Sequence, residues 1–250
     1  MLTEFLLNLV KSRDLECAWA LLTEKMTQYG FDRVIFGYTR FRTEKSFGDF
    51  EDNLVLSNHD AEYLDKFLGE KLYYHSPMMR WANENSGAMS WSWVRGRAEQ
   101  GILSKKELEI IELNVKFDIS AGYTISFHST SHRTRSILSL TGRSGITQDQ
   151  VDDIWAEHGD EIELIWQVAN LKLTSLPYAT DTRKLTKRQV EVLEWVSDGK
   201  TTADAAKIMG LTPATVEKHL RLARDILNVD TTAQAILKAS LLNQIFTLDS

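Results

Sequence analysis

Four charged residues near the C-terminus recur at a spacing that places them on one side of a helix: Glu217, Lys218, Arg221 and Arg224. In the major groove of DNA, a guanidinium can donate two hydrogen bonds to guanine, and a carboxylate can accept one from the amino group of cytosine. Arg221 and Glu217 are therefore candidates for contacts with base edges. Nearby groups that could contact phosphates and fix the register are Lys200, Thr201 and Thr215.

Capping signals divide the surrounding stretch, residues 185–246, into short helices. Threonines stand before three apolar runs, where a hydroxyl can accept a hydrogen bond from a free backbone N–H. They are Thr186, then Thr201 or Thr202, then Thr212. Gly199 and Gly210 are expected to end the first two helices. Pro213 opens the third helix, where its missing N–H does no harm.

The tight turn Gly210-Leu211-Thr212 between two short helices is typical of a helix-turn-helix, whose second helix enters the major groove. Apolar spacing predicts that each helix buries one face. The residues expected inside are Val190, Leu193 and Val196, then Ala205, Ile208 and Met209, then Val216, Leu220, Ala223 and Leu227. We therefore predict a domain that binds double-stranded DNA. The structural alternative is a small helical bundle with a charged, solvated face.

The charge distribution is compatible with this prediction. From Arg183 onward the chain has ten Lys and Arg residues against eight Asp and Glu, whereas the preceding part has 19 against 27. A mildly basic segment joined to an acidic one fits a protein whose smaller part meets phosphate. Ordinary surface variation explains a swing of this size nearly as well, so charge alone decides nothing.

Composition limits the class of protein. The 250 residues are 43% apolar and 26% charged, without a run of eighteen apolar residues or a recognisable signal peptide. Cys17 is the only cysteine, as expected in a reducing cytoplasm. The histidines are scattered, so we expect no metal site. The segment 142–145, Gly-Arg-Ser-Gly, has the wrong spacing for a nucleophile elbow, and no phosphate loop or dinucleotide fingerprint occurs, so we expect no enzyme.

The part of the chain before residue 174 mixes helical and strand patterns. Strands are expected at Arg33–Thr39, Asn53–Leu56, Met89–Val94, Tyr123–His128 and Arg135–Leu140, and helices at Leu15–Tyr29, Ala61–Leu72 and Lys105–Phe117. A longer helix follows the capping pair Thr147 and Gln150. The fold class is α+β: an N-terminal α-β-α sandwich around an antiparallel sheet, and an all-α C-terminal domain of four helices. The predicted domains are 1–173 and 185–250, with a linker at 174–184 that contains Pro177.

The C-terminal stretch resembles the DNA-binding domain of LuxR-type regulators over its whole length. The matching residues are Leu185-Thr186, Glu191-Val192-Leu193, Trp195, Gly199-Lys200-Thr201, Ala206, Thr215-Val216 and Leu227. The resemblance implies a four-helix module that dimerises partly through its last helix, Thr231–Leu242. Three positions depart from the family: Ala205 replaces a bulkier residue, Asn228 replaces a glycine, and Glu217 is acidic where a basic or amide residue is usual. Glu217 makes the operator sequence unpredictable.

The preceding domain looks like the signal-binding domain of quorum-sensing LuxR-type proteins, which bind N-acyl-homoserine lactones. The family spaces its pocket residues as Tyr, Trp, Tyr, Asp-Pro and Trp, and the stretch 58–91 keeps that spacing without a gap. Pro77 and Trp91 match in identity, and Gly122 fits a glycine before a strand. The positions implied to contact a ligand are His59, Tyr63, Phe67, Ser76, Trp91 and Ser139.

Four of these positions carry a changed side chain. The resemblance implies that the family's Asp accepts a hydrogen bond from the ligand amide, and charge-assisted bonds are about twice as strong as neutral ones. Ser76 stands in its place. Tyr63 replaces a Trp that donates to the lactone carbonyl, Phe67 lacks a hydroxyl, and His59 replaces a Tyr. Two lost polar partners would weaken lactone binding by about one to four orders of magnitude.

Three interpretations of the pocket stay open: a different amphipathic signal or an unusual acyl-homoserine lactone, a standard lactone held by a rearranged network, or a domain that needs no signal and whose aromatics are core. We expect a cytoplasmic homodimer that binds DNA and a small molecule, with no membrane partner and no cofactor. An isologous dimer would read a roughly palindromic site. The alternative is an anti-activator that acts by forming heterodimers with a related regulator.

Overall fold

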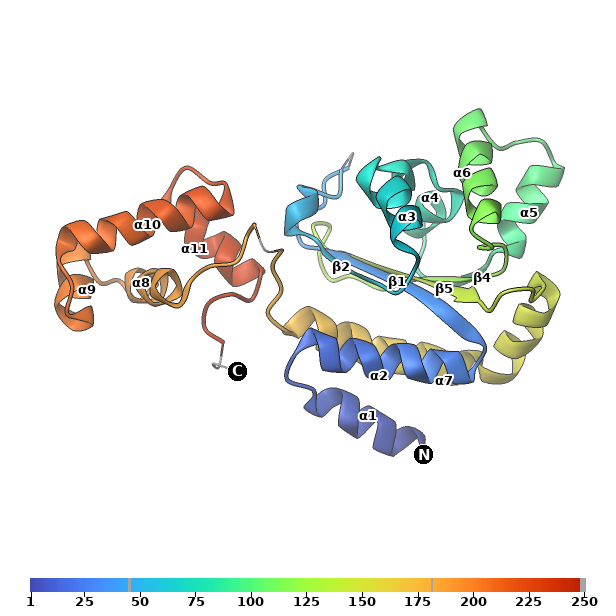
Figure 1. Cartoon of the computed structure of the whole chain (residues 1–250), viewed down its shortest axis with the longest axis horizontal. Coiled ribbons are helices and arrows are strands. Elements are labelled where there is room, and N and C mark those ends of the chain that lie inside the picture. Colours follow the sequence, from blue (N-terminus) through green and yellow to red (C-terminus); the bar gives the residue numbers. More distant parts are fainter. Residues whose placement is uncertain (45, 181, 248–250) are drawn as a thin grey trace.

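The structure is a computed structural model that describes residues 1–44, 46–180 and 182–247. A domain built on a sheet is followed by a separate group of helices near the C-terminus (Figure 1). The predicted linker includes Asp181, and the predicted C-terminal domain includes Leu248–Ser250; these residues lie outside the described part of the chain.

Five strands form one antiparallel sheet in the order β2-β1-β5-β4-β3. Their bounds are β1 Phe31–Thr39, β2 Leu54–Ser57, β3 Gly87–Ser90, β4 Gly122–Ser126 and β5 Arg135–Gly142. β4 and β5 pair in antiparallel orientation. The polar turn at residues 129–134 connects them, as the sequence predicts. The central strands β1 and β5 present side chains alternately to the two faces of the sheet.

One face of the sheet is covered by two helices from the two ends of the domain, α2 (Leu15–Gln28) and α7 (Gln148–Ser175), and α1 (Leu2–Lys11) packs against these helices on the side away from the sheet (Figure 1). Thr147 and Gln150 form the predicted capping box at the start of α7. Trp166 of α7 is fully buried and stacks on Phe36 of β1, with ring centroids 6.2 Å apart. This side of the sheet holds the main core of the domain.

The opposite face of the sheet is covered by shorter elements (Figure 1). They are α3 (Ala61–Leu64), the helical turns η2 (Asp65–Gly69) and η3 (Leu72–His75), α4 (Pro77–Glu84), α5 (Ser92–Glu99) and α6 (Lys105–Lys116). The turn η1 (Phe50–Asp52) precedes β2. The arrangement is the predicted α-β-α sandwich. Here the residues of β1 and β5 that face away from the main core, among them Ile35 and Ser139, line a cavity, and Ile35 also packs against a second, smaller group of buried apolar side chains.

Four helices form the C-terminal domain of the described chain: α8 (Lys187–Ser197), α9 (Thr202–Met209), α10 (Pro213–Leu227) and α11 (Thr232–Leu241). Thr186 and Thr201 form capping boxes, and the Thr212 side chain accepts from the backbone N–H of Thr215. Gly210 has a φ of 66°, in the left-handed region that allows the turn between α9 and α10. The helix-turn-helix prediction is therefore confirmed.

The predicted apolar face of α10 is correct: Val216, Leu220, Ala223 and Leu227 are all buried. In α9, however, Ile208 is 48% exposed, contrary to the prediction, and Ala206 is buried in its place. A helix of eight residues buries only one narrow face, here formed by Ala205, Ala206 and the half-buried Met209. In α8, Val192 and Leu193 are buried, while Val190 and Val196 are only partly so.

Several boundaries in the N-terminal domain differ from the sequence prediction. The helix expected at Ala61–Leu72 is divided into α3 and η2 and ends at Gly69. The strand expected at Met89–Val94 ends at Ser90, and α5 begins at Ser92. The backbone N–H of Ser92 donates to Ser90 Oγ, a local bond that turns the chain out of the extended conformation. The long helix α7 continues to Ser175, two residues into the segment predicted as linker.

Candidate functional site

A cavity of about 330 Å³ lies between the sheet and the helices α3 to α6. We call it the His59 cavity. All six residues that the sequence singles out for ligand contact line it: His59, Tyr63, Phe67, Ser76, Trp91 and Ser139. Each of them comes from a different element or loop, and the fold places all six around one cavity, as the family spacing predicts.

Three of these side chains form a stack along the cavity wall. The His59 and Tyr63 rings lie 5.3 Å apart, and the Tyr63 and Phe67 rings also lie 5.3 Å apart at an interplanar angle of 13°. The Tyr63 hydroxyl donates to Asn114 Oδ1 at 3.0 Å. Burial raises the pKa of the Tyr63 hydroxyl, which therefore stays protonated and able to donate. The hydroxyl oxygen of Tyr63 can still accept hydrogen bonds.

His59 is a neutral member of this wall. Its Nδ1 lies 3.1 Å from Ser57 Oγ, and its Nε2 lies 3.3 Å from Thr141 Oγ1. Burial, assisted by the positive charge of Arg33, lowers the pKa of His59 from 6.5 to about 4. A neutral imidazole flanked by two hydroxyls is a hydrogen-bonding group without a net charge.

Ser76 is buried at the start of α4, yet its side chain does not cap that helix. Its Oγ makes no hydrogen bond within the described part of the chain, and Pro77 occupies the first helical position after it. A buried hydroxyl that faces a cavity without a protein partner is available to donate to or accept from a bound molecule.

Trp91 is held against the sheet by a second network. Its Nε1 donates to Thr124 Oγ1 at 2.9 Å, and Thr124 Oγ1 lies 3.3 Å from Ser139 Oγ. A Cβ built on Gly122 would lie 2.2 Å from Leu140 O and 3.0 Å from the Trp91 ring. Only a glycine therefore fits between the indole and β5, which gives a physical reason for Gly122 in this place.

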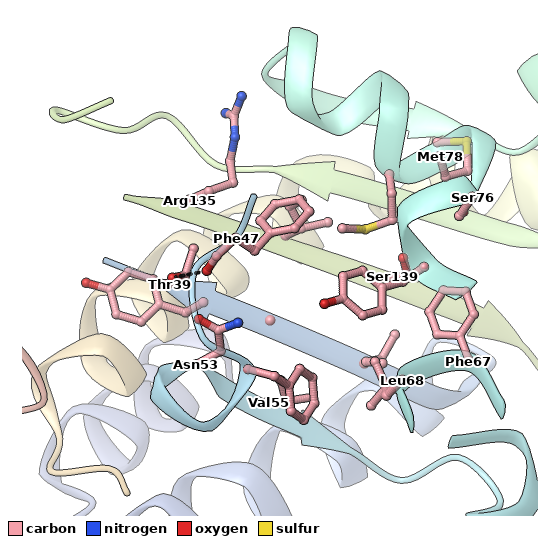
Figure 2. A pocket seen from close by; sticks show the side chains of 17 residues that line it. Thr39, Phe47, Asn53, Val55, Phe67, Leu68, Ser76, Met78, Arg135 and Ser139 are labelled. Atoms are coloured by element: carbon pink, nitrogen blue, oxygen red, sulfur yellow. Dashed lines mark hydrogen bonds between the residues drawn. The ribbon is translucent and has the colours of Figure 1, made fainter. Parts of the chain in front are cut away.

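A second, apolar cavity adjoins the first. It has a volume of about 100 Å³, and we call it the Phe47 cavity. The two cavities share Ile35, Phe67, Ser76, Met78 and Ser139 as lining residues. Figure 2 shows Phe47, Asn53 and Val55 reaching this space from the side opposite Phe67 and Ser76. Thr39 Oγ1 donates to Phe47 O at 2.9 Å and fixes that end of the wall.

The sequence prediction missed three polar residues of these networks: Asn114, Thr124 and Thr141. Thr124 and Thr141 are almost completely buried on strands otherwise rich in apolar residues. Polar residues at alternate positions of a buried strand indicate a face that meets a cavity or a partner. Asn114 carries no comparable signal, because an asparagine on α6 is ordinary for an amphipathic helix.

Of the seven residues predicted to contact DNA, two directly precede α9 and the other five lie on α10. Lys200, Thr201, Glu217, Lys218 and Arg221 are exposed, and Thr215 and Arg224 are half-buried. Thr201 is already engaged as the cap of α9, and its Oγ1 donates to Asp204. Arg221 lies 3.2 Å from Asp225 on the next turn of α10. A bond to DNA would have to replace or share these exposed contacts.

Arg224 is the most restrained of the four charged residues on α10. Its Nη1 donates to Thr232 Oγ1 at 2.9 Å, and its Nη2 lies 3.3 Å from Glu217 Oε1. Glu217 thus neutralises a cation on the same face. The structure places Arg224 between α10 and α11 rather than fully in solvent, a position that helical spacing alone does not predict.

Family comparisons agree with this geometry. Residues 14–173 match the autoinducer binding domain, and residues 183–239 match the bacterial regulatory proteins of the luxR family. A relative, the transcriptional activator protein AnoR of Acinetobacter nosocomialis, is 41% identical over 222 residues, which cover 86% of this chain and 87% of AnoR. A DNA-binding helix-turn-helix joined to an autoinducer-binding domain defines a quorum-sensing transcription regulator. The chain belongs to the luxR family, and the prediction that it is not an enzyme is confirmed.

Two solved structures show a similar fold. Escherichia coli SdiA has a TM-score of 0.53 and 16% identity, with 98% of each chain covered. The N-acylhomoserine lactone dependent factor CepR2 of Burkholderia cenocepacia has a TM-score of 0.53 and 14% identity, with 69% of this chain and 93% of that chain covered. No helix in the described part of this chain is long and apolar enough to cross a membrane.

Proposed function

We propose that this protein is a cytoplasmic, homodimeric regulator whose DNA binding is modulated by a small amphipathic signal in the His59 and Phe47 cavities. The observation that carries this proposal is the meeting of six side chains from distant parts of the chain around one cavity. Residues 1–173 would bind the signal and dimerise, 174–184 would link the domains, and 185–250 would bind DNA.

The lining of the cavities argues for a neutral ligand. In the described part of the chain neither cavity is lined by a carboxylate, and His59 is neutral at physiological pH. Each lining includes one arginine that already has a partner: Arg95 pairs with Asp149, and Arg135 donates to Asn83 O. Hydroxyls gather in the His59 cavity, whereas Phe47, Val55 and Leu68 surround the other. A compact polar head beside an apolar chain fits both parts, as in an acyl-homoserine lactone. CepR2 is described as dependent on such a lactone.

The polar contacts favour an unusual member of this class. Ser76 offers a neutral hydroxyl where the family resemblance implies a carboxylate, and Tyr63 already donates its hydroxyl proton to Asn114. Trp91 is likewise occupied by Thr124. An acyl-homoserine lactone would therefore rely on Ser76 and on acceptors in the wall, or a different neutral amphipath would occupy the site. AnoR carries the name of an activator, and we infer the same direction of action here.

DNA binding would use Lys200, Thr201, Thr215, Glu217, Lys218, Arg221 and Arg224. As an isologous dimer, the protein would present two copies of α10 to half-sites about one helical turn apart. α11 is a candidate for part of the dimer contact, since Leu237 on it is 61% exposed. Arg221 is the proposed base-reading residue, and its contact with Asp225 is exposed, so a base in the groove would replace or share it.

The ligand part of the proposal is tested by tryptophan fluorescence, because Trp91 lines the His59 cavity. The full-length protein is titrated with homoserine lactones that carry short, medium and long acyl tails. We expect saturable quenching with at least one tail length. Ser139→Phe, which places a ring where the two cavities meet, should abolish it. Saturable quenching that persists in Ser139→Phe would place the lactone elsewhere and contradict the proposal.

The DNA part is tested by a gel-shift selection with genomic fragments, followed by titration of a selected duplex. Arg221→Ala should lose about tenfold to a hundredfold in specific affinity, as expected for one bidentate guanine contact. Lys105→Ala is the charge control, since Lys105 is highly exposed on α6 in the other domain. Unchanged specific binding by Arg221→Ala would refute the orientation of α10. A folded protein that selects no fragment would indicate an anti-activator instead.

A further inference from the structure

The short segment 47–55 contacts both the cavity and the DNA-binding domain. Phe47, Phe50, Asn53 and Val55 line the Phe47 cavity. The acidic residues between them, Asp49, Glu51 and Asp52, contact the linker and the C-terminal domain instead. Figure 2 shows that Phe47, Asn53 and Val55 border the cavity from this segment and from β2. Apolar side chains at the cavity and acidic side chains at the other domain therefore alternate within one short segment.

The acidic residues bind two cations from the other part of the molecule. Lys238 of α11 places its Nζ 2.6 Å from Asp52 Oδ2, and both side chains are nearly buried. Arg183, which precedes α8, places its Nη2 2.9 Å from Asp49 Oδ2. In addition, Thr180 and Thr182 of the linker donate their hydroxyls to Glu51 Oε2 at 2.8 and 2.5 Å.

The same two cations also hold the end of the recognition helix α10. Lys238 Nζ donates to Leu227 O at 2.8 Å, and Arg183 Nη1 donates to Ile226 O at 2.9 Å. The last carbonyls of a helix lack partners within the helix and carry partial negative charge, so cations stabilise them. Each cation thus joins a carboxylate beside the cavity to a carbonyl at the C-terminus of α10.

We call the contacts among Asp49, Asp52, Arg183 and Lys238 the bridge. Two polar atoms of the bridge lack a hydrogen-bond partner among the described residues. Asp52 Oδ1 and Arg183 Nε are both buried without a hydrogen-bond partner in the described part of the chain, and they lie 3.8 Å apart. A hydrogen bond between them needs a separation about 0.8 Å shorter. A small movement of η1 toward Arg183 would form that bond, and a movement away would weaken the existing ones. The contact is therefore sensitive to the position of η1.

We propose that segment 47–55 couples the Phe47 cavity to α10 through the bridge formed by Asp49, Asp52, Arg183 and Lys238. A molecule in the cavity would displace Phe47 and Phe50, and the carboxylates would carry that displacement to the two cations. This coupling deepens the proposed function, on which it rests only in taking the cavity as the site of the signal.

The test fills the cavity from within the chain and needs neither signal nor DNA. Gly37 lines the Phe47 cavity, and a Cβ built on it meets nothing within 4 Å, so Gly37→Leu places a side chain in that space. Amide hydrogen exchange of full-length protein is measured at the last turn of α10, residues 224–228, and tryptic cleavage is measured after Arg183. We expect both to rise several-fold, because the leucine pushes the segment away from the bridge.

The bridge is then removed in the same proteins. In the Asp52→Asn background, or with Asp49→Asn if the first variant folds poorly, Gly37→Leu should no longer change either rate. Asp149→Asn, which removes an exposed carboxylate paired with Arg95, is the control background and should leave the Gly37→Leu effect intact. An equal effect in all backgrounds, or no effect of Gly37→Leu on the otherwise wild-type chain, overturns the proposal. Either result leaves signal binding itself untouched, since no signal is added.

Discussion

Glu217 and Arg224 face each other across two turns of the recognition helix, with Glu217 Oε1 3.3 Å from Arg224 Nη2. The carboxylate is exposed and the guanidinium half-buried, so the pair reduces the positive charge of α10 at the surface that would meet phosphate. The pair therefore lowers the sequence-independent affinity for DNA, which comes mainly from contacts between cations and phosphates.

Glu217→Gln should therefore strengthen nonspecific DNA binding. Releasing Arg224 adds about one effective cation, so affinity for a random duplex should rise several-fold at low salt and the salt slope should steepen by about one. Fluorescence anisotropy across a salt series measures both quantities. Glu191→Gln, which removes a carboxylate from α8, is the matched control. A salt slope identical to that of the wild type would show that the pair does not restrain Arg224.

Ser76→Asp should improve binding of an acyl-homoserine lactone by about tenfold, since a carboxylate accepts a stronger hydrogen bond from the ligand amide than a hydroxyl does. Titration with N-octanoyl-homoserine lactone measures the change. Ser76→Asn is the control, because Asn and Asp are similar helix caps at the start of α4 and only Asp adds charge. Equal affinities of the Asp and Asn variants would show that the ligand amide does not meet residue 76.

Gly122→Ala should destabilise the N-terminal domain by about 2 kcal/mol or more, because the added methyl overlaps Leu140 O and presses on the Trp91 ring. Gly37→Ala is the matched control on strand β1 of the same sheet, where the same methyl meets nothing within 4 Å. Urea denaturation followed by fluorescence gives both values. Similar stability of the two variants would mean that Trp91 is not fixed against β4 as described.

His59 should make the N-terminal domain less stable in mild acid. Its pKa is about 4 in the folded protein and 6.5 when unperturbed, so between these values the unfolded chain binds more protons. Its contribution is complete above pH 6.5 and is lost as pH falls toward 4. From pH 7 to pH 5 the expected loss is about 2 kcal/mol.

Urea denaturation at several pH values checks this loss against His59→Gln, which keeps a polar group near Ser57 and Thr141 but cannot titrate. Carboxylates titrate in both proteins, so the difference between the two curves isolates the histidine. Parallel curves would show that His59 is protonated in the folded protein well above its expected pKa.

Local signals made the C-terminal domain predictable from sequence. Thr186, Thr212 and Gly210 act on backbone groups within a few residues, and each does in the structure what its type predicts. The failure at Ile208 has the opposite cause, because its exposure depends on how α9 lies against α10. Arg224 likewise depends on a neighbouring helix, through Thr232.

The cavity was predictable only in part. Family spacing identified residues from His59 to Ser139 that line it, whereas Thr124 and Asn114 join through bonds between distant segments. The bridge at Asp52 could not be predicted from the sequence for the same reason. Its partner Lys238 lies 186 residues away along the chain, and no local pattern in residues 47–55 indicates an acidic contact with another domain.

The central claim is that a small molecule in the cavities controls DNA binding, and mass spectrometry of the full-length protein, purified natively and then stripped of bound small molecules, tests it most directly. We expect one neutral amphipathic molecule per chain, absent from Ser139→Phe. Its removal and return should change the affinity for a selected genomic duplex. A folded protein that carries no such molecule and binds that duplex equally well before and after stripping would contradict the account.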